Sequence, residues 1–145
     1  MKLQLKDCKI THERANQLKE EYVNTRANSL NIDLHRRNHF RNRGAGFIED
    51  VRDVTFDLEI LEEYIAYVKE EANKEGLTNL GLRVYLGAYP KNDTTKNIKN
   101  PGYSNMFFMP THQENNDDNR SRDGVIQGVD GLNIGHQGLP PNRIL

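Results

Sequence analysis

The feature that most constrains the fold is a stretch with helical periodicity at residues 57–75. Apolar side chains recur there at spacings of three and four, which places them on one face of a helix. They are Leu58, Leu61, Tyr64, Ile65, Val68 and Ala72. Asp57 is a residue type that caps helix N-termini, and Gly76 is one that ends helices. The sequence therefore predicts an amphipathic helix that needs an apolar surface to pack against.

Two segments with strand character follow this helix. Residues 82–89 place apolar side chains at the even positions, and arginine, tyrosine and glycine at the odd positions. Residues 103–110 are apolar on both faces, which is typical of a central strand. We predict that the two strands pair antiparallel through a long polar loop. With residues 51–56 as a further strand, the core has the order strand, helix, strand, strand.

The flanking segments are more polar. Thr11 is suited to cap a helix over about residues 12–29, and residues 3–10 are expected to form an edge strand or a simple lead-in. Residues 113–145 form a polar loop and then a tail spaced by glycines and ending in prolines, which excludes a regular helix. This tail is expected to drape over the domain, to reach a neighbouring subunit or to stay mobile.

The composition fits a small core with long solvated appendages. The chain has 145 residues, of which 35% are hydrophobic and 28% are charged; this length fits one domain, residues 1–145, with its core at about residues 47–112. The expected fold class is α+β, with a small, mainly antiparallel sheet covered by one amphipathic helix. An N-terminal helix and an extended C-terminal tail complete it.

Several classes of function are disfavoured. The net charge of -1 argues against attraction of the whole molecule to nucleic acid or membrane. The single cysteine, Cys8, rules out an internal disulfide, and the scattered histidines do not form a zinc motif. No cofactor or metal motif is present, and no apolar run is long enough to span a membrane, so cytoplasmic residence is expected. The sequence favours a non-catalytic protein over an enzyme.

A candidate binding surface lies on the odd-numbered face of the first strand. Arg83 stands between apolar neighbours, where a guanidinium must be exposed or paired. Either it forms a structural ion pair with a carboxylate such as Asp53, Asp57 or Glu63, or it lines an anion or nucleotide pocket walled by tyrosines. The candidate ligand- or partner-binding residues are Arg83, Tyr85, Tyr89, Tyr103, Thr111 and His112.

A second candidate is the most basic segment of the chain, residues 35–43. Arg36, Arg37, Arg41 and Arg43 are candidate phosphate-binding residues, and Phe40 could stack on a base. A solvated loop with a glycine hinge explains the same residues, and the overall charge favours this simpler interpretation.

The central motifs resemble a group of small flavobacterial proteins. The matching segments are residues 55–67, the strand motif GLRVYLGAYP at residues 81–90, Gly102-Tyr-Ser and residues 107–111. The helical lead at residues 10–25 and the tail sequence Gly138-Leu-Pro-Pro141 are also similar. The resemblance implies no particular activity, because the group has no established function.

Two functional hypotheses follow. The first is a non-catalytic cytoplasmic binding or assembly module that associates with itself or with a protein partner, because exposed sheet edges and apolar tails favour pairing. The alternative is a nucleotide- or nucleic-acid-acting protein, such as an enzyme of a defence system, that uses residues 35–43 and His112. Nucleic acid is the less favoured partner, and no membrane partner is expected.

Overall fold

The computed structural model describes residues 4–39, 49–98, 101–113, 124–133 and 135–137. The chain divides into two compact units, Asp53–Gly138 and Met1–Arg52 with Leu139–Leu145. The expectation of a single domain over residues 1–145 stays a prediction. Within the described ranges, no helix is both long and apolar enough to cross a membrane.

The N-terminal unit is helical. It contains α1 (Leu5–Cys8), α2 (His12–Tyr22), the π-helix η1 (Val23–Ala27) and α3 (Asn28–His39). The predicted cap is confirmed, because the Thr11 hydroxyl accepts a hydrogen bond from the Arg14 amide at 3.1 Å. The strand expected within residues 3–10 is wrong: the Asp7 carboxylate accepts the Gln4 amide at 3.1 Å and closes a helical turn there.

Helical structure extends ten residues beyond the predicted end at residue 29, so the loop interpretation of residues 35–39 is wrong. No proline or glycine occurs between Thr11 and Arg43, so nothing in the sequence breaks the helix. The apolar stripe of the N-terminal helices does not continue through α3, and a polar side chain instead connects α3 to the following segment. Buried Asn31 accepts the Asp50 amide on its Oδ1 at 2.7 Å, next to buried Val51.

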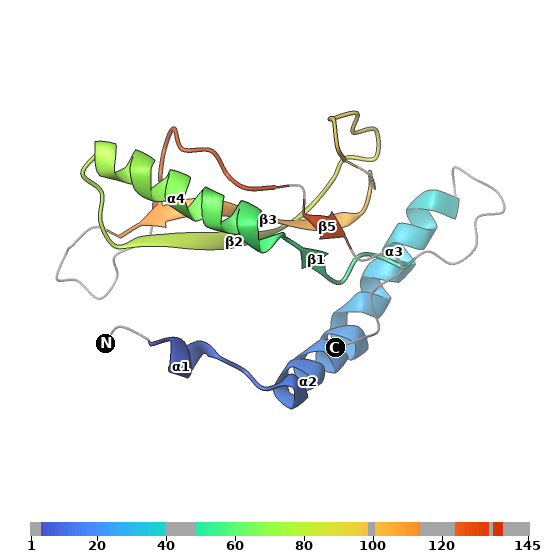
Figure 1. Ribbon diagram of the computed structural model, residues 1–145. Helices are drawn as coiled ribbons and strands as arrows, with labels where there is room; N and C mark the ends of the chain where they lie inside the picture. The colour runs from blue at the N-terminus through green and yellow to red at the C-terminus, as the bar shows by residue number, and fades with distance from the viewer. Residues whose placement is uncertain (1–3, 40–48, 99–100, 114–123, 134, 138–145) are drawn as a thin grey trace. The chain divides into compact units, whose positions relative to one another are not determined.

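The second unit is α+β, as predicted. Along the chain it contains β1 (Val54–Thr55), α4 (Leu58–Lys74), β2 (Leu80–Ala88), β3 (Ser104–His112), β4 (Gly124–Val125) and β5 (His136–Gln137). The order strand, helix, strand, strand is confirmed. β2, β3 and β4 form an antiparallel sheet with β3 in the centre, also as predicted. Figure 1 shows α4 lying along this sheet.

The prediction that residues 51–56 join the main sheet is wrong. β1 pairs antiparallel with β5 in a separate two-stranded sheet. Phe56, just after β1, instead contacts the main sheet through its ring, which packs edge-on against Phe108 with centroids 5.0 Å apart. The β-branched and aromatic residues of this segment therefore indicate a strand correctly but do not identify its partner.

The register divides the main sheet into two faces. Val84 lies opposite Phe108, and Tyr85 lies opposite Phe107. Directly opposed side chains share a face, so the even-numbered residues of both strands form one face and the odd-numbered residues the other. Leu82 and Phe108 pack against the buried side of α4. We call the even-numbered side the α4 face and the odd-numbered side the far face.

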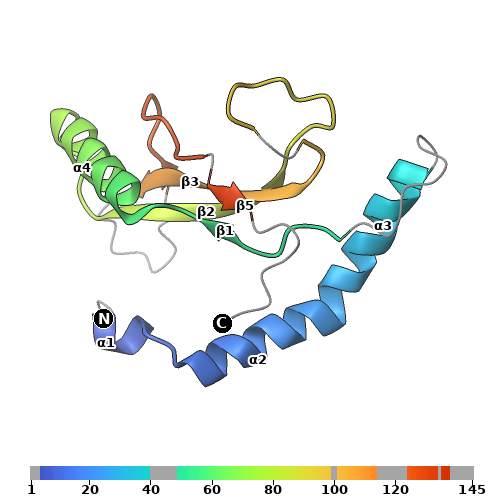
Figure 2. The same cartoon turned by 45° about the vertical axis from the view of Figure 1, so that its right-hand side comes forward.

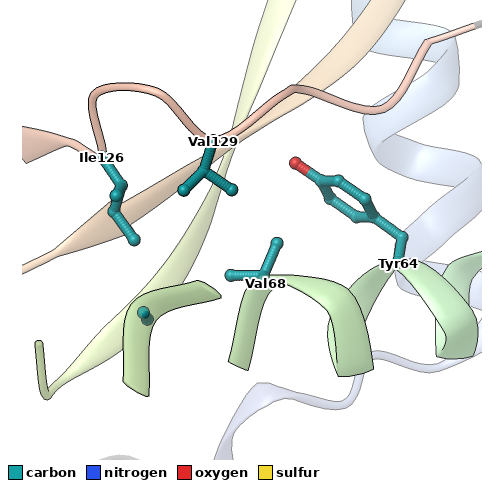
Figure 3. Close-up of a cluster of buried hydrophobic side chains, with 5 residues drawn as sticks. Tyr64, Val68, Ile126 and Val129 are labelled. Atoms are coloured by element: carbon teal, nitrogen blue, oxygen red, sulfur yellow. The ribbon is translucent and has the colours of Figure 1, made fainter. Parts of the chain in front are cut away.

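The core lies between α4 and residues 124–133. Figure 3 shows Tyr64 and Val68 of α4 pointing toward Ile126 and Val129, and Ala72 completes this buried cluster. The helix ends as predicted: Gly76 has φ +66°, and the Leu77 amide donates to Ala72 O at 2.9 Å. Of the predicted stripe, Tyr64, Val68 and Ala72 are in the buried cluster. Leu61 and Ile65 are half-buried outside this cluster, and Leu58 in the first turn is 74% exposed.

Residues 124–133 drape over the sheet, which was one of the three expected behaviours of the tail. The Ile126 amide donates to Pro110 O at 2.9 Å. Leu132 then returns to the same edge of β3 and exchanges two backbone hydrogen bonds with Phe108, at 2.8 and 2.9 Å. This segment therefore covers the edge of β3, and it supplies two of the five buried residues of the core cluster, Ile126 and Val129 (Figures 1 and 3).

The α4 face of β2 is only partly covered. Leu82 packs against the core, but Val84 is 52% exposed and Leu86 is 81% exposed. The alternation in the sequence predicts the two faces correctly, yet the apolar face of β2 is not buried along its length. The core forms over the centre of the sheet, while β2 is an edge strand.

Candidate ligand pocket on the far face of the sheet

The structure places all but one of the predicted surface residues on one face of the sheet, and of these Tyr89 lines the pocket described below. Arg83 and Tyr85 lie on the far face of β2, and Thr111 lies on the far face of β3. Tyr89 and Tyr103 continue this face just beyond the strands, where the Tyr89 amide donates to Tyr103 O at 3.0 Å. His112 is the exception, because it pairs with Leu80 and therefore belongs to the α4 face.

Aromatic and sulfur-containing side chains form the floor of the far face. Tyr85 stacks on Phe107 with ring centroids 5.2 Å apart and planes inclined by 8°. Arg83 is half-buried opposite Met109, and it has interactions within the protein. Thr111 is buried, so it is a structural residue rather than a contact surface.

A pocket of about 430 Å³ opens at one end of this face, a volume within the range of small-molecule sites. Its floor comes from β2 and β3, and its walls come from the loop after β2 and from residues 131–133. The main lining residues are Gly87, Tyr89, Asn105, Phe107, Met109 and Asn133.

Hydrogen bonds fix a polar group in the pocket wall. The Tyr89 hydroxyl donates to Asn133 Oδ1 at 3.0 Å, and Asn105 Nδ2 donates to the same oxygen at 3.3 Å. Tyr89 and Asn105 are both buried. With its oxygen engaged by two donors, the Asn133 amide is held in one orientation and offers its Nδ2 hydrogens as donors.

Two glycines make room for this arrangement. A Cβ at Gly131 would lie 2.5 Å from Met109 Sδ and 2.6 Å from Phe108 O, so only glycine lets the C-terminal segment approach the strand so closely. A Cβ at Gly87 would lie 2.6 Å from Asn105 Oδ1. Gly87 thus leaves space beside the Asn105 amide in the pocket.

The loop after β2 supplies the other wall, through Asp93, Thr95 and Ile98. Hydrogen bonds from the Thr95 side chain and backbone lower the pKa of Asp93, so its carboxylate is charged at neutral pH. Asn97 in this loop has φ +73°, and the Gly102 amide closes the loop by donating to Tyr89 O at 3.0 Å. Among the described residues that line the pocket, Asp93 is the only charged one.

The sequence does not predict two residues that complete this pocket, Asn105 and Asn133. Asn105 and Asn133 stand 28 positions apart, and neither has a neighbour that marks it as functional. The one signal in the sequence is Gly131, two residues before Asn133, because a glycine can indicate a close backbone approach. Tyr85 borders the pocket through its stack on Phe107.

The basic segment does not form a described site. Arg36 is exposed on α3, and Arg37 belongs to the same helix. Arg41 and Arg43 lie outside the described residues, so the predicted phosphate site stays a prediction. In the described part of the chain, no group of three or more histidine, cysteine, aspartate or glutamate side chains is placed to hold a metal ion.

Comparisons with known proteins add no assignment. No protein-family model, no curated protein and no solved structure matches this chain. The resemblance to the flavobacterial group stays a prediction.

Proposed function

We propose that this protein is a non-catalytic binding module whose ligand site is the far-face pocket. The observation that carries the proposal is the Asn133 amide, which Tyr89 and Asn105 orient in the wall of a pocket with an apolar floor. A few fixed polar groups among apolar ones are the usual composition of a small-molecule site. The far face also contains the residues Arg83, Tyr85 and Tyr103, which the sequence singles out for binding.

The chemistry of the lining favours an uncharged, planar ligand that carries an amide. Phe107 and Met109 offer flat or polarisable surfaces to a ring. The Asn105 and Asn133 side chains offer amide donors and acceptors at the wall. The charged Asp93 repels anions, and no described lysine, arginine or histidine lines the pocket to attract them.

The test compares two probes of the same shape, benzamide and benzoate, by NMR titration of the full chain. Benzamide is expected to shift the side-chain amide signals of Asn105 and Asn133 in a saturable way. Benzoate is expected to bind measurably more weakly than benzamide, because it replaces the amide with a charge of the same sign as the Asp93 carboxylate.

Two variants locate the binding. Asn133→Ala removes the oriented amide and should abolish the benzamide shifts. Leu58→Ala, at an exposed position of α4, is the matched control and should bind benzamide like the unmodified protein. A folded protein whose pocket signals do not respond to benzamide would refute this ligand class, and equal binding of both probes would refute the role of Asp93.

A further inference from the structure

We infer that β2 pairs with β2 of a second copy of this chain, antiparallel about a twofold axis at Val84. β2 is an edge strand of nine residues, and its outer edge makes no backbone hydrogen bond within the described residues. Soluble proteins usually protect such an edge with lysine, proline or a bulge. β2 has none of these between Leu80 and Ala88.

The hydrogen-bond pattern determines which residues can pair. Tyr89 donates to Tyr103, and Phe108 is bonded to Leu132 on the other side of β3, so the odd-numbered residues of β2 use their backbone groups toward β3. The even-numbered residues therefore direct their N–H and C=O groups to the free edge. They are the same residues that place their side chains on the α4 face, among them the exposed Val84 and Leu86.

A register centred on Val84 pairs every residue of β2 with a residue of the partner's β2. It places Val84 opposite the partner's Val84, Leu82 opposite the partner's Leu86, and Leu80 opposite the partner's Ala88. All these pairs have their backbone groups directed at each other. Val84 is the middle residue of the strand, so a twofold axis at any other even-numbered residue pairs fewer residues.

The side chains are self-complementary in this register. A pocket of about 240 Å³ lies between α4 and β2, lined by Ile65, Val68, Lys69, Leu80, Gly81 and Leu82. Leu86 is the most exposed large apolar residue of β2, and the register brings the partner's Leu86 beside Leu82 at this pocket. Each copy thus presents an exposed leucine to the apolar hollow of the other copy.

The charges are compatible with this pairing. Arg83 is the only charged residue of β2. The register places it across from the partner's Tyr85 instead of a second Arg83, which avoids like-charge repulsion and permits a cation–π contact. The product is a continuous sheet in the order β4-β3-β2-β2-β3-β4. Both copies of α4 lie on one side, and both far-face pockets lie on the other.

The first test is the mass of the full chain in solution, measured by light scattering and sedimentation over a range of concentrations. A dimer is expected. Val84→Lys should give a folded monomer, because Val84 is half-exposed and the substitution places two lysines together on the twofold axis. A monomeric unmodified protein would overturn the inference, and so would a Val84→Lys variant that remains dimeric.

The second test fixes the register by disulfide trapping in a Cys8→Ser background. A hydrogen-bonded antiparallel pair places Cα atoms about 5.5 Å apart, which a disulfide can bridge. Val84→Cys should therefore cross-link on oxidation. Leu86→Cys tests the neighbouring register and should not cross-link, because the two copies of residue 86 are roughly 14 Å apart in the Val84 register. Cross-linking through residue 86 in place of residue 84 would overturn the Val84 axis.

Discussion

Strand β2 and residues 124–133 each contain four leucine, isoleucine or valine residues, but these side chains lie in different environments. Leu86 of β2 is 81% exposed, whereas Ile126 and Val129 are 3% and 7% exposed. Figure 3 shows Ile126 and Val129 in the cluster with Val68 of α4. Position in the sheet explains this difference. β3 has the central place, so the segment along its covered edge enters the core and the strand on its other side forms an outer edge.

The edge position of β2 also means that its apolar side chains contribute to association between copies more than to the stability of a single chain. An apolar side chain stabilises the fold only where folding removes it from water. Ile126 satisfies this condition within one chain, and Leu86 satisfies it only if a second copy covers it. Figure 2 shows residues 124–133 returning along β3. Ile126 and Val129 of this segment are buried in the core.

The largest effect is expected from Ile126→Ala. Its side chain is almost fully buried against α4, so the truncation leaves a cavity and should lower the free energy of unfolding by about 3 kcal/mol. Urea unfolding measures this change. A loss below about 0.5 kcal/mol, the level of a surface substitution, would mean that residues 124–133 are not part of the core in solution.

Gly131→Ala tests how residues 124–133 approach β3. The added methyl group would meet Phe108 O at 2.6 Å and Met109 Sδ at 2.5 Å, and a backbone atom cannot rotate away. We expect a loss of roughly 1–3 kcal/mol in unfolding free energy and weaker benzamide binding, because the pocket wall moves. Gly128→Ala is a useful comparison, since its strain comes from φ +79° without any steric contact.

Tyr64→Phe removes one hydrogen bond between α4 and residues 124–133. The Tyr64 hydroxyl donates to Asp130 O at 3.0 Å, and its loss should cost about 1 kcal/mol. Burial raises the pKa of Tyr64 above its ordinary value of 10.0. The unfolded chain therefore loses this proton first, so the contribution is complete below pH 10.0 and is lost as the pH rises through the folded pKa.

The Phe variant should lack this part of the alkaline destabilisation, which thermal melts from pH 7 to pH 11 would reveal. Tyr67→Phe is the matched control. It removes the hydroxyl that accepts the Asp130 amide at 3.3 Å but leaves Tyr64 in place, so the alkaline loss should persist. If both variants melt alike above pH 10, Tyr64 does not cause the pH dependence.

The sequence predicts local structure here better than it predicts partners. Helix α4, its glycine stop, the antiparallel pairing of β2 with β3 and the far-face tyrosines all follow from periodicity and turn chemistry. The partner of β1 and the core role of Ile126 do not, because both depend on contacts between residues far apart in the chain. The pocket was missed for the same reason, since Asn105 and Asn133 meet only after the C-terminal segment has folded back.

The smallest effect on folding is expected from Leu86→Thr. The side chain is exposed and threonine suits a strand, so the free energy of unfolding of the separate chain should change by less than about 0.5 kcal/mol. Association should nevertheless weaken, because the polar side chain no longer fills the hollow between α4 and β2. Urea unfolding at low protein concentration and sedimentation at high concentration measure the two effects separately. A large loss of stability at low concentration would show that Leu86 is buried within its own chain, and the contrast between β2 and residues 124–133 would then disappear.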